Sequence, residues 1–328
     1  MKYRFLGNTG IQVSEISLGS WLTYGNVIDN KTAEDCFKEA IENGINFFDT
    51  ADVYNNGGAE SVWGDIIQNY SRADLVLATK CYFPMSQNVN NQGLSRKHIT
   101  ESIHASLKRL KTDYVDLYQC HRYDMNTPLE ETISTMNTLI QQGKILYWGV
   151  SQWSAVQIIE AIYLSKQMGC QPPVSDQPIY NIINRSLEVD VLDVCERYNV
   201  GIVVYSPMAQ GILTGKYSGG KVPVHSRAAN DETSVYMKKR MTIEIFNKVD
   251  KLKPIANEIG LDLPQFALAW CLRQDQLSSV ITGASSPLQV KNNIKASGVV
   301  ITDEVSKQVD LIFENFPIDQ YTGSIIRK

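Results

Sequence analysis

The chain has 328 residues, of which 43% are hydrophobic and 20% charged, a composition typical of a globular protein that argues against disorder of the whole chain. Its 31 lysines and arginines against 35 acidic residues leave a net charge of −4 without any basic block, which argues against nucleic acid as a main partner. No apolar run approaches the roughly 20 residues of a membrane span and no leader opens the sequence, so we expect a cytoplasmic protein without membrane insertion.

Short β-rich segments alternate with longer segments of helical periodicity along almost the full length. A hairpin is expected over residues 3–13 and could close the bottom of a barrel. The expected strands are 16–19, 46–49, 75–80, 115–120, 145–150, 174–177, 202–205 and 280–282. The expected helices are 32–43, 60–69, 96–110, 129–142, 155–167, 189–198, 243–260 with 264–273, and 288–296. Eight strand and helix pairs without a dividing linker predict a (β/α)₈ TIM barrel, and a single domain over residues 1–328, rather than a doubly wound sheet.

One stretch, residues 207–242, does not follow this alternation. It contains six glycines and prolines among polar and basic residues and has no convincing helical period. Structureless loops longer than about 12 to 15 residues are uncommon inside compact domains and are often functional. We therefore expect this segment, which follows the seventh barrel strand, to act as a lid.

The residues at the carboxyl ends of the expected strands are strongly polar. In a barrel these ends meet at the active-site mouth, whereas the strand interiors form the core. The residues at these positions are Asp49, Lys80, His121, Ser151, Gln177, Ser206 and Ser285. The sequence therefore predicts a functional site at the mouth.

Four residues in this region suggest a chemistry. Asp49 and Lys80 each end an apolar strand, where an unpaired charge would be costly to bury, so we expect them to form an ion pair. Tyr54 lies on the loop that leaves the strand of Asp49, and its phenol needs a nearby ammonium to become a useful proton donor at neutral pH. His121 could hold a substrate carbonyl oxygen beside Tyr54. Such a set suits hydride reduction of an aldehyde or ketone.

Two long segments resemble motifs of the aldo-keto reductase family. Residues 44–54, GINFFDTADVY, resemble its G-x-x-x-x-D-T-A-x-x-Y motif, and residues 106–118, SLKRLKTDYVDLY, resemble its S-L-x-R-L-x-x-D-Y-x-D-L-Y motif. The resemblance runs from the hairpin to residue 296. It implies that Asp49, Tyr54, Lys80 and His121 are the family's catalytic tetrad, with Tyr54 as the general acid.

Within that family the chain is similar to the potassium-channel β-subunits and their microbial homologues. Residues 147–154, YWGVSQWS, and 269–273, AWCLR, carry this closer resemblance. It implies a homo-oligomer, a tetramer, and it raises a second possible function, a nucleotide-binding regulatory subunit of a membrane channel with little turnover. The channel subunits have Asn where this chain has His121, which favours the enzyme.

The sequence lacks the usual nucleotide-binding motifs. No G-x-G-x-x-G follows an expected strand, and residues 211–217 are one residue too short for a P-loop, which argues against a Rossmann site and against ATP. The six cysteines show no C-x-x-C spacing, so no metal site is expected. The resemblance instead implies a nicotinamide cofactor across the barrel mouth.

The resemblance assigns this cofactor three groups of residues. The nicotinamide end would be lined by Ser20, Trp21, Ser151, Gln152, Gln177 and Tyr205. The pyrophosphate and adenosine 2′-phosphate would be bound by Ser206, Pro207, Met208, Ala209, Gly211, Thr214, Lys216 and Arg227. The adenosine end would be bound by Gly283, Ser285, Gln289, Asn292 and Asn293. Because a lysine and an arginine suit a second phosphate, we expect NADPH rather than NADH. Gln152 and Tyr205 depart from the relatives, which have Asn and Trp at these positions.

The expected function is NADPH-dependent reduction of small-molecule aldehydes and reactive ketones. A third alternative, an aldolase that forms a Schiff base on Lys80, needs an unpaired and neutral lysine, which Asp49 argues against. Substrate selectivity is expected from Trp21, Tyr24, Tyr54, Phe83, Tyr123 and the C-terminal tail.

Overall fold

The computed structural model describes residues 1–314 except 23, 25–27 and 225, and leaves the side chain of residue 232 undescribed. Eight parallel strands close into a barrel in the order β10, β3, β4, β5, β6, β7, β8, β9. They are β3 (Ile16–Gly19), β4 (Phe47–Asp49), β5 (Val76–Cys81), β6 (Val115–Cys120), β7 (Ile145–Val150), β8 (Ser175–Asp176), β9 (Gly201–Val204) and β10 (Leu277–Thr282). The predicted (β/α)₈ barrel is confirmed.

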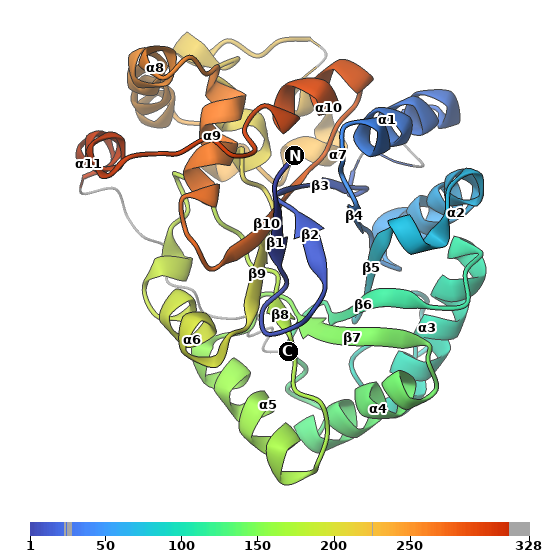
Figure 1. Cartoon of the computed structure of the whole chain (residues 1–328). Helices are drawn as coiled ribbons and strands as arrows, with labels where there is room; N and C mark the ends of the chain where they lie inside the picture. Colours follow the sequence, from blue (N-terminus) through green and yellow to red (C-terminus); the bar gives the residue numbers. More distant parts are fainter. Residues whose placement is uncertain (23, 25–27, 225, 315–328) are drawn as a thin grey trace.

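Helices surround the barrel as an outer ring (Figure 1). They are α1 (Asn30–Glu42), α2 (Gly58–Ile66), α3 (Arg96–Leu110), α4 (Leu129–Gln141), α5 (Ala155–Gln167), α6 (Val191–Tyr198), α8 (Ile243–Glu258), α9 (Leu263–Leu272), α10 (Pro287–Ile294) and α11 (Asp303–Ile312). Their apolar faces and the outward side chains of the strands form the larger core. None of the described helices is both long and apolar enough to cross a membrane.

The hairpin of β1 (Tyr3–Phe5) and β2 (Gln12–Ser14) lies across the end of the barrel where the strands begin (Figure 1). Leu6 and Val13 are fully buried and belong to the smaller core inside the barrel, with Phe47, Ala78 and Leu117 from the strands. The hairpin therefore completes the interior core from below, as the sequence suggested.

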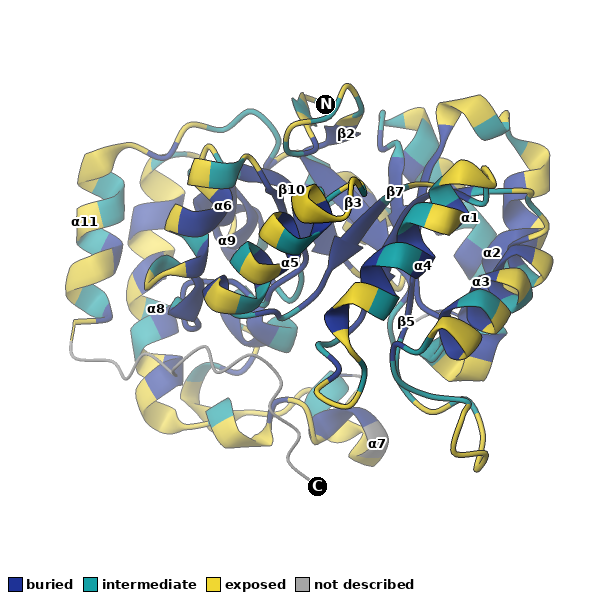
Figure 2. Ribbon diagram, turned by 90° about the horizontal axis from the view of Figure 1, so that it is seen from below, coloured by how far each residue is buried: buried dark blue, intermediate teal, exposed yellow. Residues whose placement is uncertain are grey.

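The segment between β9 and α8 differs from the structureless loop that the sequence predicts. It folds into one-turn pieces: 3₁₀ turns at Ala209–Thr214, Ser218–Gly220, Arg227–Ala229 and Lys238–Arg240, and the short helix α7 (Asp231–Ser234). Single turns are too short to show an amphipathic period, so no helix could be predicted here from the sequence. Figure 2 shows α7 at the end of the barrel opposite the N-terminal hairpin, and so on the side where the strands end.

Several element boundaries also differ. The helix predicted over 60–69 is α2 followed by a 3₁₀ turn at Ile67–Asn69, and the helix predicted over 189–198 begins at Val191 after a 3₁₀ turn at Ser186–Glu188. The sequence analysis missed α11 altogether, although Thr302 caps it by accepting a hydrogen bond from the amide of Val305. A polar residue before two acidic residues, Asp303 and Glu304, is a helix-start signal that was available.

Candidate active site

The centre of the mouth is a buried lysine held by three acceptors. Lys80 Nζ lies 2.6 Å from Asp49 Oδ2, 2.8 Å from the carbonyl oxygen of Thr50 and 3.3 Å from the hydroxyl oxygen of Tyr54. β4 and β5 are neighbouring parallel strands, so the end of one brings Asp49 beside Lys80 of the other. The predicted ion pair is present. Burial lowers the pKa of Lys80, but the ion pair with Asp49 opposes this shift and engages Nζ, so the pairing argues against a Schiff-base lysine.

The second carboxylate oxygen of Asp49 also accepts hydrogen bonds. The side-chain amide of Gln177 donates to Asp49 Oδ1 at 2.8 Å, and that of Gln119 donates to the same oxygen at 3.3 Å. Gln119 points into the barrel from the interior of β6, a position that the strand-end analysis did not sample. These two amides fix the carboxylate and through it Lys80, so Gln177 supports the ion pair in addition to the cofactor role predicted for it.

His121 follows β6 directly and lies between two aromatic rings. Its ring centroid is 5.7 Å from that of Tyr54 and 4.9 Å from that of Phe83, both in edge-on arrangements. Burial, together with the charges of Lys80 and Arg122, holds the pKa of His121 well below its usual value. His121 is therefore a neutral imidazole at neutral pH, and its Nδ1 has no hydrogen-bond partner among the described residues.

The pKa of Tyr54 is shifted in the direction opposite to the one expected from the sequence. Burial and the nearby Asp49 carboxylate raise the pKa of Tyr54 well above its usual value, whereas the sequence analysis expected the ammonium to lower it. The charge of Arg122 opposes this shift, but burial and Asp49 outweigh it, so desolvation decides the direction. Tyr54 therefore holds its proton at every physiological pH.

Arg122 is a residue of the mouth that sequence reasoning missed. It follows His121, donates from Nη1 to the carbonyl oxygen of His121, and lies 3.5 Å from Ser151 Oγ. Its guanidinium carbon is 5.4 Å from the ring centroid of Phe83. Arg122 directly follows His121, so it lies one position beyond the strand-end residue that was predicted from the sequence.

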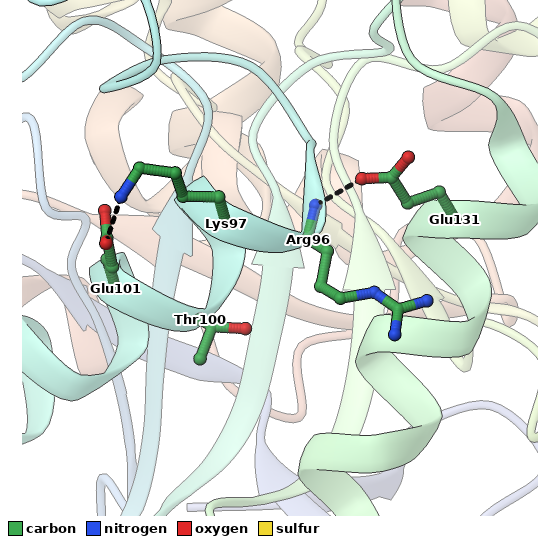
Figure 3. Close-up of a pocket in the computed structure, with 5 residues that line it drawn as sticks. All are labelled: Arg96, Lys97, Thr100, Glu101 and Glu131. Carbon is green, nitrogen blue, oxygen red and sulfur yellow. Dashed lines mark hydrogen bonds and ion pairs between the residues drawn. The ribbon is translucent and has the colours of Figure 1, made fainter.

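A hollow on the outer surface lies away from this site. Figure 3 shows its lining on α3 and α4, formed by Arg96, Lys97, Thr100, Glu101 and Glu131. Lys97 pairs with Glu101, and the amide of Arg96 donates to Glu131 Oε1 at 2.7 Å. These residues belong to the helical ring rather than to the strand ends, so we assign the hollow no catalytic role.

Comparison with known proteins agrees with this geometry. The model of the Aldo/keto reductase family matches residues 15–314. The chain belongs to the aldo/keto reductase family. Two curated relatives, from Oryza sativa subsp. japonica and Arabidopsis thaliana, are each described as "Probable voltage-gated potassium channel subunit beta"; each is 41% identical over 322 residues, covering 97% of this chain and 98% of the relative. A Schizosaccharomyces pombe protein described as a subunit of the same kind is 41% identical over 327 residues, covering 97% of this chain and 94% of its own length.

Members of the family are oxidoreductases that generally use NAD(P)H, so the remaining mouth residues can be tested for their fit to a dinucleotide. At the reacting end, the hydroxyl of Ser151 donates to the carbonyl oxygen of Gln177 at 2.8 Å, and the Gln152 amide donates to the hydroxyl of Tyr205. The ring of Trp21 lies 6.4 Å from that of Tyr54. These five predicted residues lie just after the ends of barrel strands, on the side where Tyr54 and Lys80 lie, whereas the hydroxyl of Ser20 is buried and bonded to Thr50 Oγ1 at 2.8 Å.

The predicted phosphate segment contains two cations without an acidic partner. Lys216 and Arg227 form no ion pair with a carboxylate of any described residue, and burial lowers the pKa of both, with the charge of Arg227 lowering that of Lys216 further. Arg227 is bonded to the side chain of Gln210, which in turn donates to Ser206 Oγ. Two unpaired, partly buried cations need an anion, so these residues fit the phosphates of a dinucleotide.

The missing side chain of Gly211 allows the side chain of Lys216 to lie close to the backbone at this position. Its φ is +97°, and a Cβ at this position would lie 3.2 Å from both Cε and Nζ of Lys216. Thr214 donates from its hydroxyl to the carbonyl oxygen of Gly211 at 2.8 Å, and the carbonyl oxygen of Met208 accepts the amide of Gly211 at 2.9 Å. Pro207 and Ala209 belong to the same turn. Positive φ angles at Ser206, Ala209, Gln210 and, after β7, Gln152 concentrate strained backbone around the mouth.

The predicted adenosine residues lie before and along α10: Gly283 and Ser285 precede the helix, Gln289 is in its first turn, and Asn292 and Asn293 are in its last turn. Gln289 accepts from the amide of Ser285 at 3.0 Å and donates to its hydroxyl at 3.1 Å. Asn293 is buried, and its Nδ2 has no partner among the described residues. Gly283 follows β10 and is exposed, and Asn292 uses its carbonyl oxygen to accept from Gln265 at 3.3 Å.

Two residues of the predicted substrate wall, Tyr24 and Tyr123, contact residues outside the group around Lys80. Tyr24 is buried with its ring 5.7 Å from that of Trp63, in the layer between strands and helices, and so lies outside the mouth. Tyr123 packs edge-on against Trp153 at 4.7 Å and points its hydroxyl toward Glu160 on α5. The predicted C-terminal tail, residues 315–328, lies outside the described residues.

Proposed function

We propose that this protein is an NADPH-dependent reductase of aldehydes and reactive ketones, with Tyr54 as the proton donor. The observation that carries the proposal is the position of Lys80 Nζ, 2.6 Å from Asp49 Oδ2 and 3.3 Å from the Tyr54 hydroxyl oxygen. A phenol beside a fixed ammonium, next to a neutral imidazole, is suited to protonating an oxygen that gains negative charge. The preference for NADPH rests on Lys216 and Arg227, two cations with no acidic partner among the described residues.

Each tetrad residue has one task in this proposal. A reduced nicotinamide, when bound, supplies the hydride. Tyr54 gives its proton to the carbonyl oxygen of the substrate, and Lys80 stabilises the phenolate that remains. Asp49 opposes the lowering of the Lys80 pKa by burial and holds the amine in place. His121, which is neutral because of burial and the nearby cations, donates a hydrogen bond to the same oxygen without competing as an acid.

The Tyr54→Phe variant tests the proton donor. It should lower kcat/KM for an aldehyde with NADPH by about 100-fold or more, because general-acid catalysis is lost. Oxidation of NADPH, followed by its absorbance, measures the rate, and quenching of protein fluorescence measures cofactor binding, which should stay intact. Tyr123→Phe is the matched control because its hydroxyl faces Glu160 rather than Lys80. Turnover by Tyr54→Phe at the rate of the parent would refute the assignment.

A second candidate function is a regulatory subunit of a membrane channel, which the descriptions of the 41% identical relatives favour. Such a subunit would bind NADPH tightly and turn over little. A panel of aldehydes added to the NADPH complex separates the two functions, since flat absorbance traces across the panel would favour the subunit. A homotetramer, a cytoplasmic location and a single domain over residues 1–328 stay predictions.

A further inference from the structure

Arg122 brings to the mouth a positive charge that the reduction of a plain aldehyde does not use. The residue is partly buried at the carboxyl end of β6, beside His121 and Ser151. No carboxylate of a described residue forms an ion pair with it. Asp49, the acidic member of the tetrad, already binds Lys80, Gln177 and Gln119. Asp176 on β8 is close enough to feel the charge of Arg122, but burial raises the pKa of Asp176 well above its usual value. The guanidinium therefore has no paired carboxylate among the described residues.

The geometry leaves most donors of this guanidinium available. An arginine side chain has five N–H donors in a planar fork, and both hydrogen bonds that Arg122 makes come from Nη1. Nε and Nη2 have no acceptor among the residues that the structure describes. The ring of Phe83 lies 5.4 Å from the guanidinium carbon and limits its orientation. A planar, positioned fork with free donors is suited to bidentate binding of a carboxylate.

The phosphates of the cofactor have other cations to bind than Arg122. The two cations that fit its phosphates, Lys216 and Arg227, belong to the segment after β9, beside Gln210 and Gly211. Arg122 instead neighbours His121 and Phe83, and its charge acts on Tyr54 and Lys80. It therefore belongs to the reacting end, where the substrate must bind.

We propose that Arg122 binds a carboxylate of the substrate, so that the preferred substrates are carbonyl compounds that also carry a carboxylate, such as short aldehyde acids. This inference rests on the proposed reductase function. Arg122 contributes substrate binding and position, whereas Tyr54 and His121 act on the carbonyl oxygen.

A matched pair of aldehydes tests the inference. 4-Oxobutanoate carries the carboxylate, and methyl 4-oxobutanoate has the same chain without the charge. We expect kcat/KM with NADPH to be roughly 10- to 100-fold higher for the acid, in line with a hydrogen-bonded ion pair at a partly desolvated site. The two aldehydes share the carbonyl chemistry, so their ratio isolates recognition of the charge.

Variants of Arg122 then assign the preference to this residue. In Arg122→Met the ratio should fall close to one, and in Arg122→Lys it should be intermediate, because lysine keeps the charge but loses the planar fork. Arg96→Met is the control: it removes an equal charge from the exposed outer end of α3 and should leave the ratio unchanged. Calorimetric binding of the product acid, 4-hydroxybutanoate, to the NADP⁺ complex should weaken by the same factor in Arg122→Met.

The outcomes separate this inference from the reductase proposal. Equal turnover of acid and ester by the parent would overturn the inference and leave the reductase proposal standing. A preference for the acid that survives in Arg122→Met, or an equal loss for both aldehydes, would also overturn it. If neither aldehyde is reduced, the reductase proposal fails for this pair, and the calorimetric measurement decides about Arg122. Binding of the acid that is lost in Arg122→Met supports the inference, whereas no binding, or binding that does not depend on Arg122, overturns it.

Discussion

Asp52 is a buried acid three residues after Asp49. Its Oδ2 accepts the hydroxyl of Ser102 at 2.6 Å, whereas Oδ1 has no partner among the described residues. The nearby carboxylate of Glu60 is paired with Arg109 at 2.7 Å. Burial, with a smaller contribution from Glu60, raises the pKa of Asp52 from 3.8 to about 7. The group therefore changes its charge near neutral pH, beside the loop that carries Tyr54.

This raised pKa predicts a loss of stability with rising pH. Between the unfolded pKa of 3.8 and the folded pKa of about 7, the folded protein binds the extra proton, so the free energy of unfolding falls as pH rises through this window. In Asp52→Asn that contribution is absent. We expect the parent to lose roughly 1–3 kcal/mol more than Asp52→Asn between pH 5 and pH 8.

Urea unfolding of both proteins at the two pH values measures this difference. Asp113→Asn, an exposed acid on the turn after α3, should follow the parent. Identical pH slopes for the parent and Asp52→Asn would contradict the raised pKa.

At the scale of elements, the segment between β9 and α8 covers the mouth through an aromatic contact. The ring of Tyr236, which follows α7, lies 5.0 Å from that of Trp21 in an edge-on arrangement. Trp21 in turn lies beside Tyr54, so this contact joins the segment to the loop after β3, next to the proposed proton donor. A cofactor bound beneath the segment would have to pass this contact to leave.

Tyr236→Ala should therefore speed the release of NADPH. An aromatic pair contributes about 0.5–1.5 kcal/mol beyond its buried area, so the dissociation rate should rise several-fold, up to about tenfold. Stopped-flow fluorescence after mixing the complex with excess competitor gives this rate. Val235→Ala is the matched control, since Val235 is the exposed neighbour in the same segment. An unchanged rate in Tyr236→Ala would argue against the segment as a lid.

For the whole molecule, the N-terminal hairpin joins the first and last parts of the barrel. Arg4 donates to the carbonyl oxygens of Leu272, Gln274 and Leu277 at 2.9, 3.0 and 2.9 Å, and to Glu15 at 2.8 Å. The turn of the hairpin inserts against the backbone where β8 and β9 begin. The three bonds from Arg4 to backbone carbonyls link residues more than 250 positions apart, and together with the turn they close the core from below.

Gly7→Ala should destabilise the protein because this turn has no room for a side chain. The φ of Gly7 is +55°, and a Cβ would lie 2.5 Å from the oxygen of Val174, 2.6 Å from the nitrogen of Gly201 and 2.7 Å from the oxygen of Asn199. We expect a loss of roughly 2–4 kcal/mol in the free energy of unfolding. Gly10→Ala, at a position with nothing within 4 Å of its Cβ, should change little. Similar effects of the two substitutions would contradict this account, and a single unfolding transition in the parent would support the predicted single domain.

Elements that are encoded by neighbouring residues could be predicted from the sequence. Contacts between residues far apart in the chain could not. The strands that carry Asp49 and Lys80 were recognisable because both faces of a parallel strand are buried and read as apolar runs. Those strand ends, with the family resemblance, were enough to name the tetrad. Gln119 was missed because it lies inside a strand, and its contact with Asp49 crosses the barrel interior. Tyr236 was missed because one-turn helices have no period to detect.

The sequence by itself determined the barrel, its strand ends and the four residues at their centre, because apolar alternation, turn chemistry and motif spacing are properties of neighbours along the chain. Only the tertiary structure decided the electrostatics of the mouth. It shows that Tyr54 keeps its proton, that His121 is neutral, and that Arg122, Lys216 and Arg227 have no acidic partners among the described residues. Burial and long-range pairing set these properties, and both arise only when distant strands close into one barrel.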